Sequence, residues 1–224
     1  MVKGTDYYTA LLAEAVLFEG LDPQEIEAAR SCLAPVRRKY KKDEFIIRSG
    51  DAVRSIAILV KGSAIVIKED VYGRRLIIQE IVPGQVFAEV FACLAGIPAE
   101  VSVLAREDCE VMTFGVEAII GICPARCEHH TRVVRNLLMI LANKNLALTR
   151  KVEFLSKRTI RERLLAYLSG ESLRHGKKQF TIPYNRQQLA DYLSVDRSAL
   201  SAEISKLQKE GVLSSDRRQF HLLV

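Results

Sequence analysis

The sequence predicts an α+β protein in three parts: an antiparallel β-roll over residues 1–125, a long helix over 126–155 and a compact unit of short helices with a terminal hairpin over 156–224. Short β-rich runs, separated by glycines, recur across residues 36–116. A helical period then continues without a break to Leu155. The net positive charge is confined to the last third of the chain.

The composition is that of a folded, core-forming chain. Of the 224 residues, 49% are hydrophobic and 27% are charged, which argues against intrinsic disorder. No apolar run approaches the roughly 18 residues of a membrane-spanning helix, and residues 1–18 lack the pattern of a secretory signal. We therefore expect a cytoplasmic protein with no membrane partner. The five scattered cysteines do not resemble a disulfide framework.

Alternating apolar runs and turn residues predict the roll. Strands at this regular spacing are typical of a cupin-like antiparallel roll of about six to eight strands. Before the roll we expect helices, one of them starting with Asp22 as cap and Pro23 in the first turn. The predicted strands are residues 45–47, 55–60, 63–68, 75–81, 101–104 and 110–114.

Residues 126–155 carry an a/d seam, with apolar side chains at alternating spacings of four and three. A seam this regular predicts a homodimer, and Asn145 at an a position favours a parallel pair in one register. The alternative is that the seam packs on the chain's own roll. Beside it, Val133, Leu137 and Ile140 are expected to contact the roll. The expected dimerisation residues are Val134, Leu138, Leu141, Asn145, Leu148, Val152 and Leu155.

The last third of the chain is basic. Residues 151–224 hold 14 Lys/Arg and 8 Asp/Glu, whereas residues 1–150 hold 19 of each, so the whole excess of six positive charges lies in the last third. This asymmetry favours a polyanionic partner, the alternative being a solvated basic surface. At its start we expect a helix over residues 160–168 and a polar loop over 171–178.

Residues 185–209 have the pattern of a helix-turn-helix. Asn185 and Gln188 predict a capping box for a first helix. A tight turn at Ser194 follows, and Asp196 is expected to cap a second helix over 197–209, which has the length to enter a major groove. After Gly211, a hairpin with a basic tip at residues 216–218 forms a predicted wing. The alternative is an ordinary helical hairpin. The side chains expected to face inward are Leu200, Ile204 and Leu207.

The chemistry of the exposed residues suggests their roles on double-stranded DNA. Arg197, at the start of the second helix, can donate two hydrogen bonds to a guanine edge. Serine hydroxyls on the same face can bind phosphates or bases. The expected serines are Ser198, Ser201 and Ser205, and the expected phosphate contacts are Arg186, Lys206, Arg217 and Arg218.

This order of parts resembles the Crp–Fnr superfamily. Residues 186–207 and the following Gly211-Val212-Leu213 carry the resemblance most strongly, and Gly50, Gly62 and Pro83-Gly84 fit the roll. Residues 142–145 with 156–168 resemble a group from anaerobic Gram-positive bacteria whose effectors are mostly unassigned. The resemblance implies a bacterial, homodimeric, sequence-specific transcription regulator gated by a small-molecule or redox effector, with RNA polymerase as a further partner.

The resemblance also implies a cyclic-nucleotide-like pocket in the roll. Glu89 occupies the place of the ribose-binding glutamate, and Ala88 replaces the glycine before it. Ala99 and Glu100 stand where the family has an arginine and a hydroxyl residue for the phosphate. A carboxylate would repel that phosphate, so we do not expect cAMP, and the effector stays unknown. Asn145 falls near the family's polar contact from the dimer helix to the ligand.

Cys123, Cys127 and His130 would share one face of a helix. Thiolates and imidazole together suit zinc, iron, haem or a redox switch. We favour an ordinary helix start, with Pro124 in its first turn and Cys127 buried, and expect no certain metal or cofactor. Cys32 stands alone in the sequence, without the amino-terminal cysteine cluster of the family's iron–sulfur branch.

Two alternative functions stay open. One is a constitutive DNA-binding protein with a ligand-free roll, and the other is a metal- or haem-dependent redox sensor that uses the Cys/His stretch. An enzyme is not expected, because the sequence shows no acid–base pair, no phosphate-binding glycine loop and no nucleophile elbow.

Overall fold

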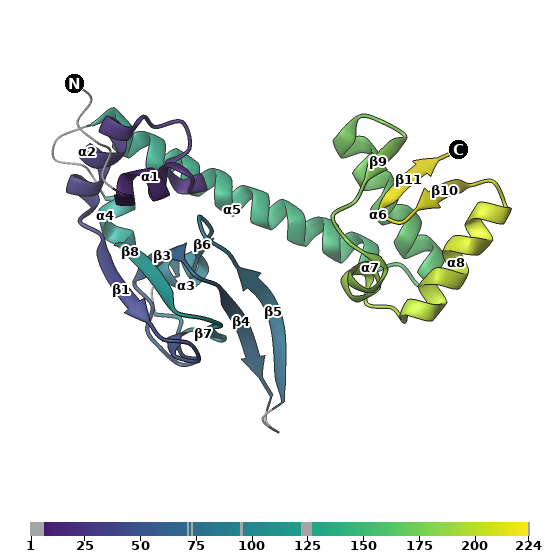
Figure 1. The fold of residues 1–224 in the computed structure, drawn as a ribbon, viewed down its shortest axis with the longest axis horizontal. Helices are drawn as coiled ribbons and strands as arrows, with labels where there is room; N and C mark the ends of the chain where they lie inside the picture. The colour runs from purple at the N-terminus through teal and green to yellow at the C-terminus, as the bar shows by residue number, and fades with distance from the viewer. Residues whose placement is uncertain (1–6, 71, 73, 95, 122–126, 224) are drawn as a thin grey trace. The chain divides into compact units, whose positions relative to one another are not determined.

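The computed structural model describes residues 7–70, 72, 74–94, 96–121 and 127–223. The chain divides into two compact units, Met1–Leu141 and Ala142–Val224 (Figure 1). The long helix predicted near residues 126–155 is present as α5 (Glu128–Leu155), whose first half belongs to the first unit and whose second half belongs to the second. No helix of the described residues has the length and apolar content to cross a membrane.

The first unit begins with α1 (Tyr7–Ala13), a 3-10 turn (Val16–Phe18) and α2 (Pro23–Leu33). The predicted start of α2 is confirmed. The Asp22 carboxylate accepts hydrogen bonds from the backbone N–H groups of Gln24 and Glu25, at 2.8 and 2.9 Å. The Glu25 carboxylate in turn accepts from the backbone N–H of Asp22, and Pro23 fills the first turn.

Two antiparallel four-stranded sheets form the roll, with strand orders β1-β8-β3-β6 and β2-β7-β4-β5. All six strands predicted from the sequence are present. The prediction missed the charged edge strand β1 and the two-residue β6, because neither has an apolar alternation. The strands are β1 (Val36–Tyr40), β2 (Phe45–Ile47), β3 (Ser55–Lys61), β4 (Ala64–Glu69), β5 (Arg75–Ile81), β6 (Val86–Phe87), β7 (Ser102–Ala105) and β8 (Cys109–Gly115), and two short helices, α3 (Glu89–Cys93) and α4 (Val116–Ile120), follow β6 and β8.

Strand β3 is buried on both faces, which explains its continuous apolar sequence. Ile56 and Ile58 belong to a core that also contains residues of α2 and α5, whereas Ala57 and Leu59 belong to a second core with residues of β4 and β7. The expectation that one face of α5 contacts the roll is confirmed, since its side chains are buried in the first core. These are Val133, Leu137 and Ile140.

Besides the second half of α5, the described residues of the second unit form three helices and a three-stranded sheet of order β10-β11-β9 (Figure 1). The expected loop over residues 171–178 is wrong, because the first helix continues to His175 and ends where Gly176 adopts φ +62°. Glu171 and Arg174 form an ion pair in its last turn, at 2.6 Å. The elements are α6 (Ile160–His175), β9 (Gln179–Thr181), α7 (Arg186–Leu193), α8 (Arg197–Lys209), β10 (Leu213–Asp216) and β11 (Gln219–Leu222).

Gly62, between β3 and β4, occupies a position where a side chain has no room. Its φ is +89°, and an added Cβ would lie 2.6 Å from the carbonyl oxygen of Asp108 and 3.0 Å from the Cα of Cys109. Gly50 has a similar φ, +95°, but an added Cβ there meets no atom within 4 Å. A substitution at Gly50 therefore introduces backbone strain alone, whereas the same substitution at Gly62 adds a steric clash.

We predict that Gly62→Ala lowers the free energy of unfolding by about 1–3 kcal/mol more than Gly50→Ala, because only the former overpacks its surroundings. Both substitutions place alanine at positive φ, a strain of about 1–2 kcal/mol. Urea unfolding followed by circular dichroism measures the difference, and equal losses for the two variants would contradict the prediction.

Candidate nucleic-acid interface and effector site

The predicted starts of α7 and α8 are confirmed. The Asn185 side-chain oxygen accepts from the backbone N–H of Gln188, and the Gln188 side-chain oxygen accepts from the backbone N–H of Asn185, both at 2.9 Å. Ser194 makes the turn with φ +54°. Asp196 then caps α8 by accepting from the backbone N–H of Ala199, at 2.9 Å. Leu200, Ile204 and Leu207 are buried as expected, which fixes the exposed face of α8.

The cap of α8 is anionic. The Ser198 hydroxyl and the Ala199 amide donate hydrogen bonds to the Asp196 carboxylate, and these bonds hold the pKa of Asp196 below its ordinary value. A charged carboxylate also interacts favourably with the positive end of the helix dipole. The start of the exposed helix face is thereby held in a defined geometry.

The recognition residues expected from the sequence lie along α8. Arg197, Ser198, Ser205 and Lys206 are exposed and Ser201 is half-buried. Ser201 donates to the carbonyl of Arg197 at 2.9 Å, and Ser205 donates to that of Ser201 at 3.0 Å. These two hydroxyls present acceptor oxygens and must rotate before they can donate to DNA.

The residues expected to contact phosphates differ in whether they already contact other side chains of the protein. Arg217, which has φ +48°, and Arg218 are exposed at the tip of the hairpin. Arg186 instead donates to the Ser215 hydroxyl at 2.9 Å, and its guanidinium lies 4.9 Å from the centre of the Phe220 ring. Burial lowers the pKa of Arg186. Among the described residues, the side chains of Arg197, Lys206, Arg217 and Arg218 make no hydrogen bond or ion pair.

Two arginines of α6, which were not predicted from the sequence, hold α8 and the end of α7 in place. Arg161 forms ion pairs with Glu210 at 2.7 Å and Glu203 at 3.6 Å. Arg163 donates to the carbonyls of Leu193 and Ser194, at 3.3 and 3.2 Å, so it satisfies groups at the end of α7. Both arginines precede the helix-turn-helix in the sequence, and no local pattern around them indicates that they contact it.

Four of the expected effector residues lie around α3 and the loop before β7, whereas Asn145 lies on α5. Ala88 precedes α3 with φ +65°, a conformation that glycine adopts without strain, and Glu89 is only 4% exposed. Ala99 is buried, and its backbone exchanges hydrogen bonds with the Gly50–Asp51 turn, at 2.7 and 2.9 Å. Glu100 is exposed, so its carboxylate faces solvent.

A pocket of about 410 Å³ lies close to these residues along the chain. It is lined by Ala92 of α3 and by Ile97 and Pro98, which directly precede Ala99. Its lining is mainly apolar, with Arg54 and Glu117 as its charged residues. Arg106, a potential substitute for the missing phosphate-binding arginine, is half-exposed and lies 3.5 Å from Glu80.

The a/d residues of α5 are only partly covered. Val134 and Leu141 pack against the core of the first unit, and Leu155 packs against that of the second. Asn145 is exposed, and its side-chain oxygen accepts from the Thr149 hydroxyl at 3.3 Å. The apolar side chains left most exposed to solvent, by 61%, 64% and 67%, are those of Leu138, Leu148 and Val152.

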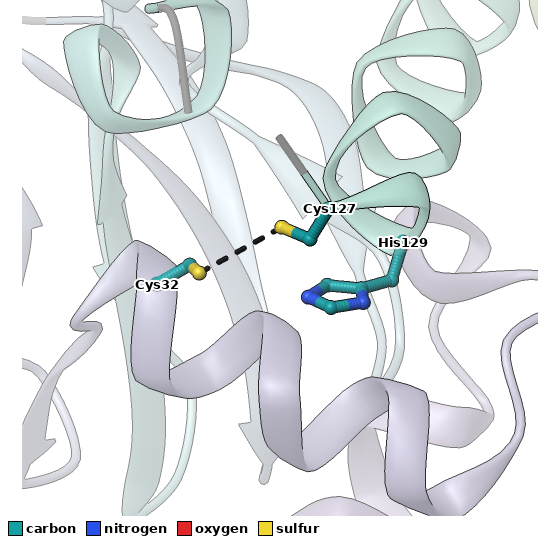
Figure 2. A group of neighbouring side chains, drawn as sticks. All are labelled: Cys32, Cys127 and His129. Atoms are coloured by element: carbon teal, nitrogen blue, oxygen red, sulfur yellow. Dashed lines mark hydrogen bonds between the residues drawn. The ribbon is translucent and has the colours of Figure 1, made fainter. Parts of the chain in front are cut away.

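The structure corrects the expected Cys/His grouping. Cys123 lies outside the described residues. Helix α5 begins only at Glu128, so the helical spacing from Cys127 to His130 does not hold. His130 is buried, with Nε2 2.7 Å from the carbonyl oxygen of Ile119. Cys127 lies instead beside His129 and Cys32, whose sulfur is 3.8 Å from that of Cys127 (Figure 2). Cys32 is therefore not isolated in space.

Comparison with known proteins identifies both units. A cyclic nucleotide-binding domain model matches residues 37–125, and a Crp-like helix-turn-helix domain model matches residues 162–223. The chain is similar to the catabolite activator protein of Thermus thermophilus, with 25% identity, a TM-score of 0.55 and 93% of each chain covered. No reviewed protein sequence matches the chain.

Two further solved structures share the fold. One is the c-di-GMP responsive global regulator CLP of Xanthomonas campestris, with 22% identity, 91% of this chain and 100% of that chain covered, and a TM-score of 0.53. The other is CprK in complex with OCPA, with 14% identity, coverage of 88% and 89%, and a TM-score of 0.59.

Proposed function

The chain belongs to the Crp–Fnr superfamily of bacterial transcription regulators, and we propose that it is a homodimer that reads a palindromic DNA site under the control of an effector other than cAMP. It is a DNA-binding regulator with an effector-binding domain. The observation that carries the proposal is the exposed face of α8, whose cations lack partners among the described residues.

The proposed DNA contacts divide into reading and anchoring. Arg197 follows the Asp196 cap, and its planar guanidinium has the geometry to bind O6 and N7 of a guanine. The hairpin tip carries Arg217 and Arg218, which are placed to neutralise phosphates. Arg186 already contacts Ser215 and Phe220. In this proposal it stabilises the hairpin and also binds a phosphate.

The exposed seam of α5 supports a homodimer. Leu138, Leu148 and Val152 are large apolar side chains on a helix, each more than half exposed in the single chain. A second copy would bury them in a parallel pair, with the two Asn145 amides satisfying each other. Two-fold symmetry would then place the two recognition helices on half-sites about one helical turn apart.

The effector is proposed to be a small molecule or a redox signal other than cAMP. Glu100 brings a carboxylate to the stretch that binds the nucleotide's phosphate in the family, and Ala99 has no cation to offer. Gating requires that the effector bind two states of the dimer with different affinity. RNA polymerase is the proposed further partner. A co-purifying small molecule would separate this proposal from a constitutive DNA-binding protein.

We predict that Arg197→Ala weakens binding to the specific site by about 1–3 kcal/mol and relaxes preference at one base in each half-site. Arg217→Ala should weaken all sequences alike and lower the salt slope by about one per monomer, because a phosphate contact releases counterions without reading bases. Gel-shift titrations on specific and scrambled duplexes at several salt concentrations measure both. If Arg197→Ala weakened both duplexes equally, its proposed reading role would be wrong.

We predict a dimer in light scattering at micromolar concentration. Leu148→Glu should shift it toward monomer, because the substitution places two carboxylates in an apolar seam. Leu173→Glu is the matched control, since Leu173 is 84% exposed but belongs to α6 and not to the seam of α5. Asn145→Leu should keep or strengthen the dimer while loosening its register. A monomeric wild-type protein would contradict the proposal.

We predict that isothermal titration calorimetry detects no binding of cAMP at physiological concentrations, because an alanine, Ala99, stands where the family has its phosphate-binding arginine. Binding at micromolar affinity or better would contradict this prediction. Arg106→Ala would then test whether Arg106, now beside Glu80, binds the phosphate.

A further inference from the structure

We propose that Cys32, Cys127 and His129 form a binding site for a zinc-class divalent metal ion. Their ligand atoms all lie within 4.8 Å of one another. Cys32 belongs to the last turn of α2, whereas Cys127 and His129 flank the first residue of α5 (Figure 2). Cys32 lies 95 positions before Cys127 in the sequence, so the fold alone brings it to the other two residues.

The distance between the two sulfur atoms fits chelation of one ion. Zinc binds thiolate sulfur at about 2.3 Å with tetrahedral angles, which places two sulfur ligands of one ion about 3.8 Å apart. The Sγ atoms of Cys32 and Cys127 are 3.8 Å apart. A disulfide would need them at about 2.05 Å. The two side chains thus already have the spacing of metal ligands.

His129 supplies the third donor. The edge of its imidazole far from Cβ points toward the two sulfur atoms (Figure 2). Its Nε2 is buried and makes no hydrogen bond with any described residue. A buried polar atom without a partner is unfavourable, because it has lost its hydrogen bonds to water, and a bond to a metal ion would offset that cost. A nitrogen and a sulfur on one zinc lie about 3.6 Å apart, and the ligand atoms here lie within 4.8 Å of one another, so at most a small movement of the ring completes the coordination.

The elements that carry the ligands are held together independently of any metal. Arg132 of α5 pairs with Glu25 of α2 at 3.0 Å and donates to the carbonyl of Gly20 at 3.1 Å. Asn136 donates to the carbonyls of Leu17 and Glu19, at 3.1 and 2.9 Å. A site on such fixed elements needs little reorganisation to bind an ion. Cys32 is exposed, which gives the ion a route in from solvent.

The donor set selects the class of ion. Two thiolates and an imidazole favour zinc and chemically similar ions over magnesium and calcium, which prefer oxygen ligands. Three protein ligands leave one tetrahedral position for water or a further ligand. A bound ion would fasten the first turn of α5 to the end of α2.

Cobalt(II) alone is the probe that tests the site, because it replaces zinc and reports its ligands by absorption. The full-length protein, with its thiols kept reduced, should bind one equivalent per chain, show thiolate-to-cobalt charge-transfer and tetrahedral d–d bands, and release cobalt to added zinc. Cys32→Ser and Cys127→Ser should each lose the charge-transfer intensity of one sulfur ligand. Their cobalt affinity should fall more than about 100-fold, beyond the usual effect of groups that only orient ligands.

His129→Ala should shift the d–d bands and weaken binding, whereas Cys93→Ser is the matched control. Cys93 is also exposed, but it lies at the end of α3, so its loss should change nothing. Circular dichroism and thermal melting establish that each variant is folded. Unchanged cobalt spectra in Cys32→Ser or Cys127→Ser would overturn the proposal, as would a reduced wild-type protein that binds no cobalt. These readouts involve no DNA, so they are independent of the regulatory function proposed above.

Discussion

Burial of one face of α5 in the core of the roll determines which side chains of the helix remain exposed for contact with a partner. Val133, Leu137 and Ile140 are almost inaccessible to solvent, and burying such side chains contributes about 1.5–3 kcal/mol each. Because residues three and four apart share a face, this contact fixes the rotation of α5 about its axis. Leu138 and Met139 are consequently left exposed. The seam is therefore exposed because a different face of α5 is buried in the chain's own core.

A similar division separates the arginines of the second unit. Arg161 and Arg163 hold α8 and the turn in place, and Arg186 is partly buried against the wing. A partly buried guanidinium has lost hydration that its partners must replace, so moving it onto DNA would cost those contacts. Arg197 and Arg217 have no such contacts to lose within the described residues. Their charge is therefore free to displace counterions from a polyanion.

Local signals made most of the fold predictable, and non-local contacts account for what was missed. Capping residues such as Asn185 and Asp196 act within three residues, so the bounds of α7 and α8 could be predicted from the sequence alone. The far end of α6 was missed because polar residues and Gly170 obscured a helix that packing sustains. Nothing local indicates that Cys32 meets Cys127, since only the packing of α2 on α5 determines that contact. The same applies to Arg186, whose partner Ser215 comes from the hairpin.

The position of the proposed metal site gives it a means of influencing α5 without touching the effector residues. Its ligands connect α2, which is packed into the core of the roll, to the first turn of the helix whose later residues form the seam. An ion there would affect regulation only if it bound two arrangements of α5 with different affinity. In that case linkage requires reciprocity, so any ligand that favours the same arrangement must raise the affinity for metal by the same factor. Oxidation of either thiol would remove a donor and eliminate this coupling, which would make the cysteine pair sensitive to redox conditions as well as to metal.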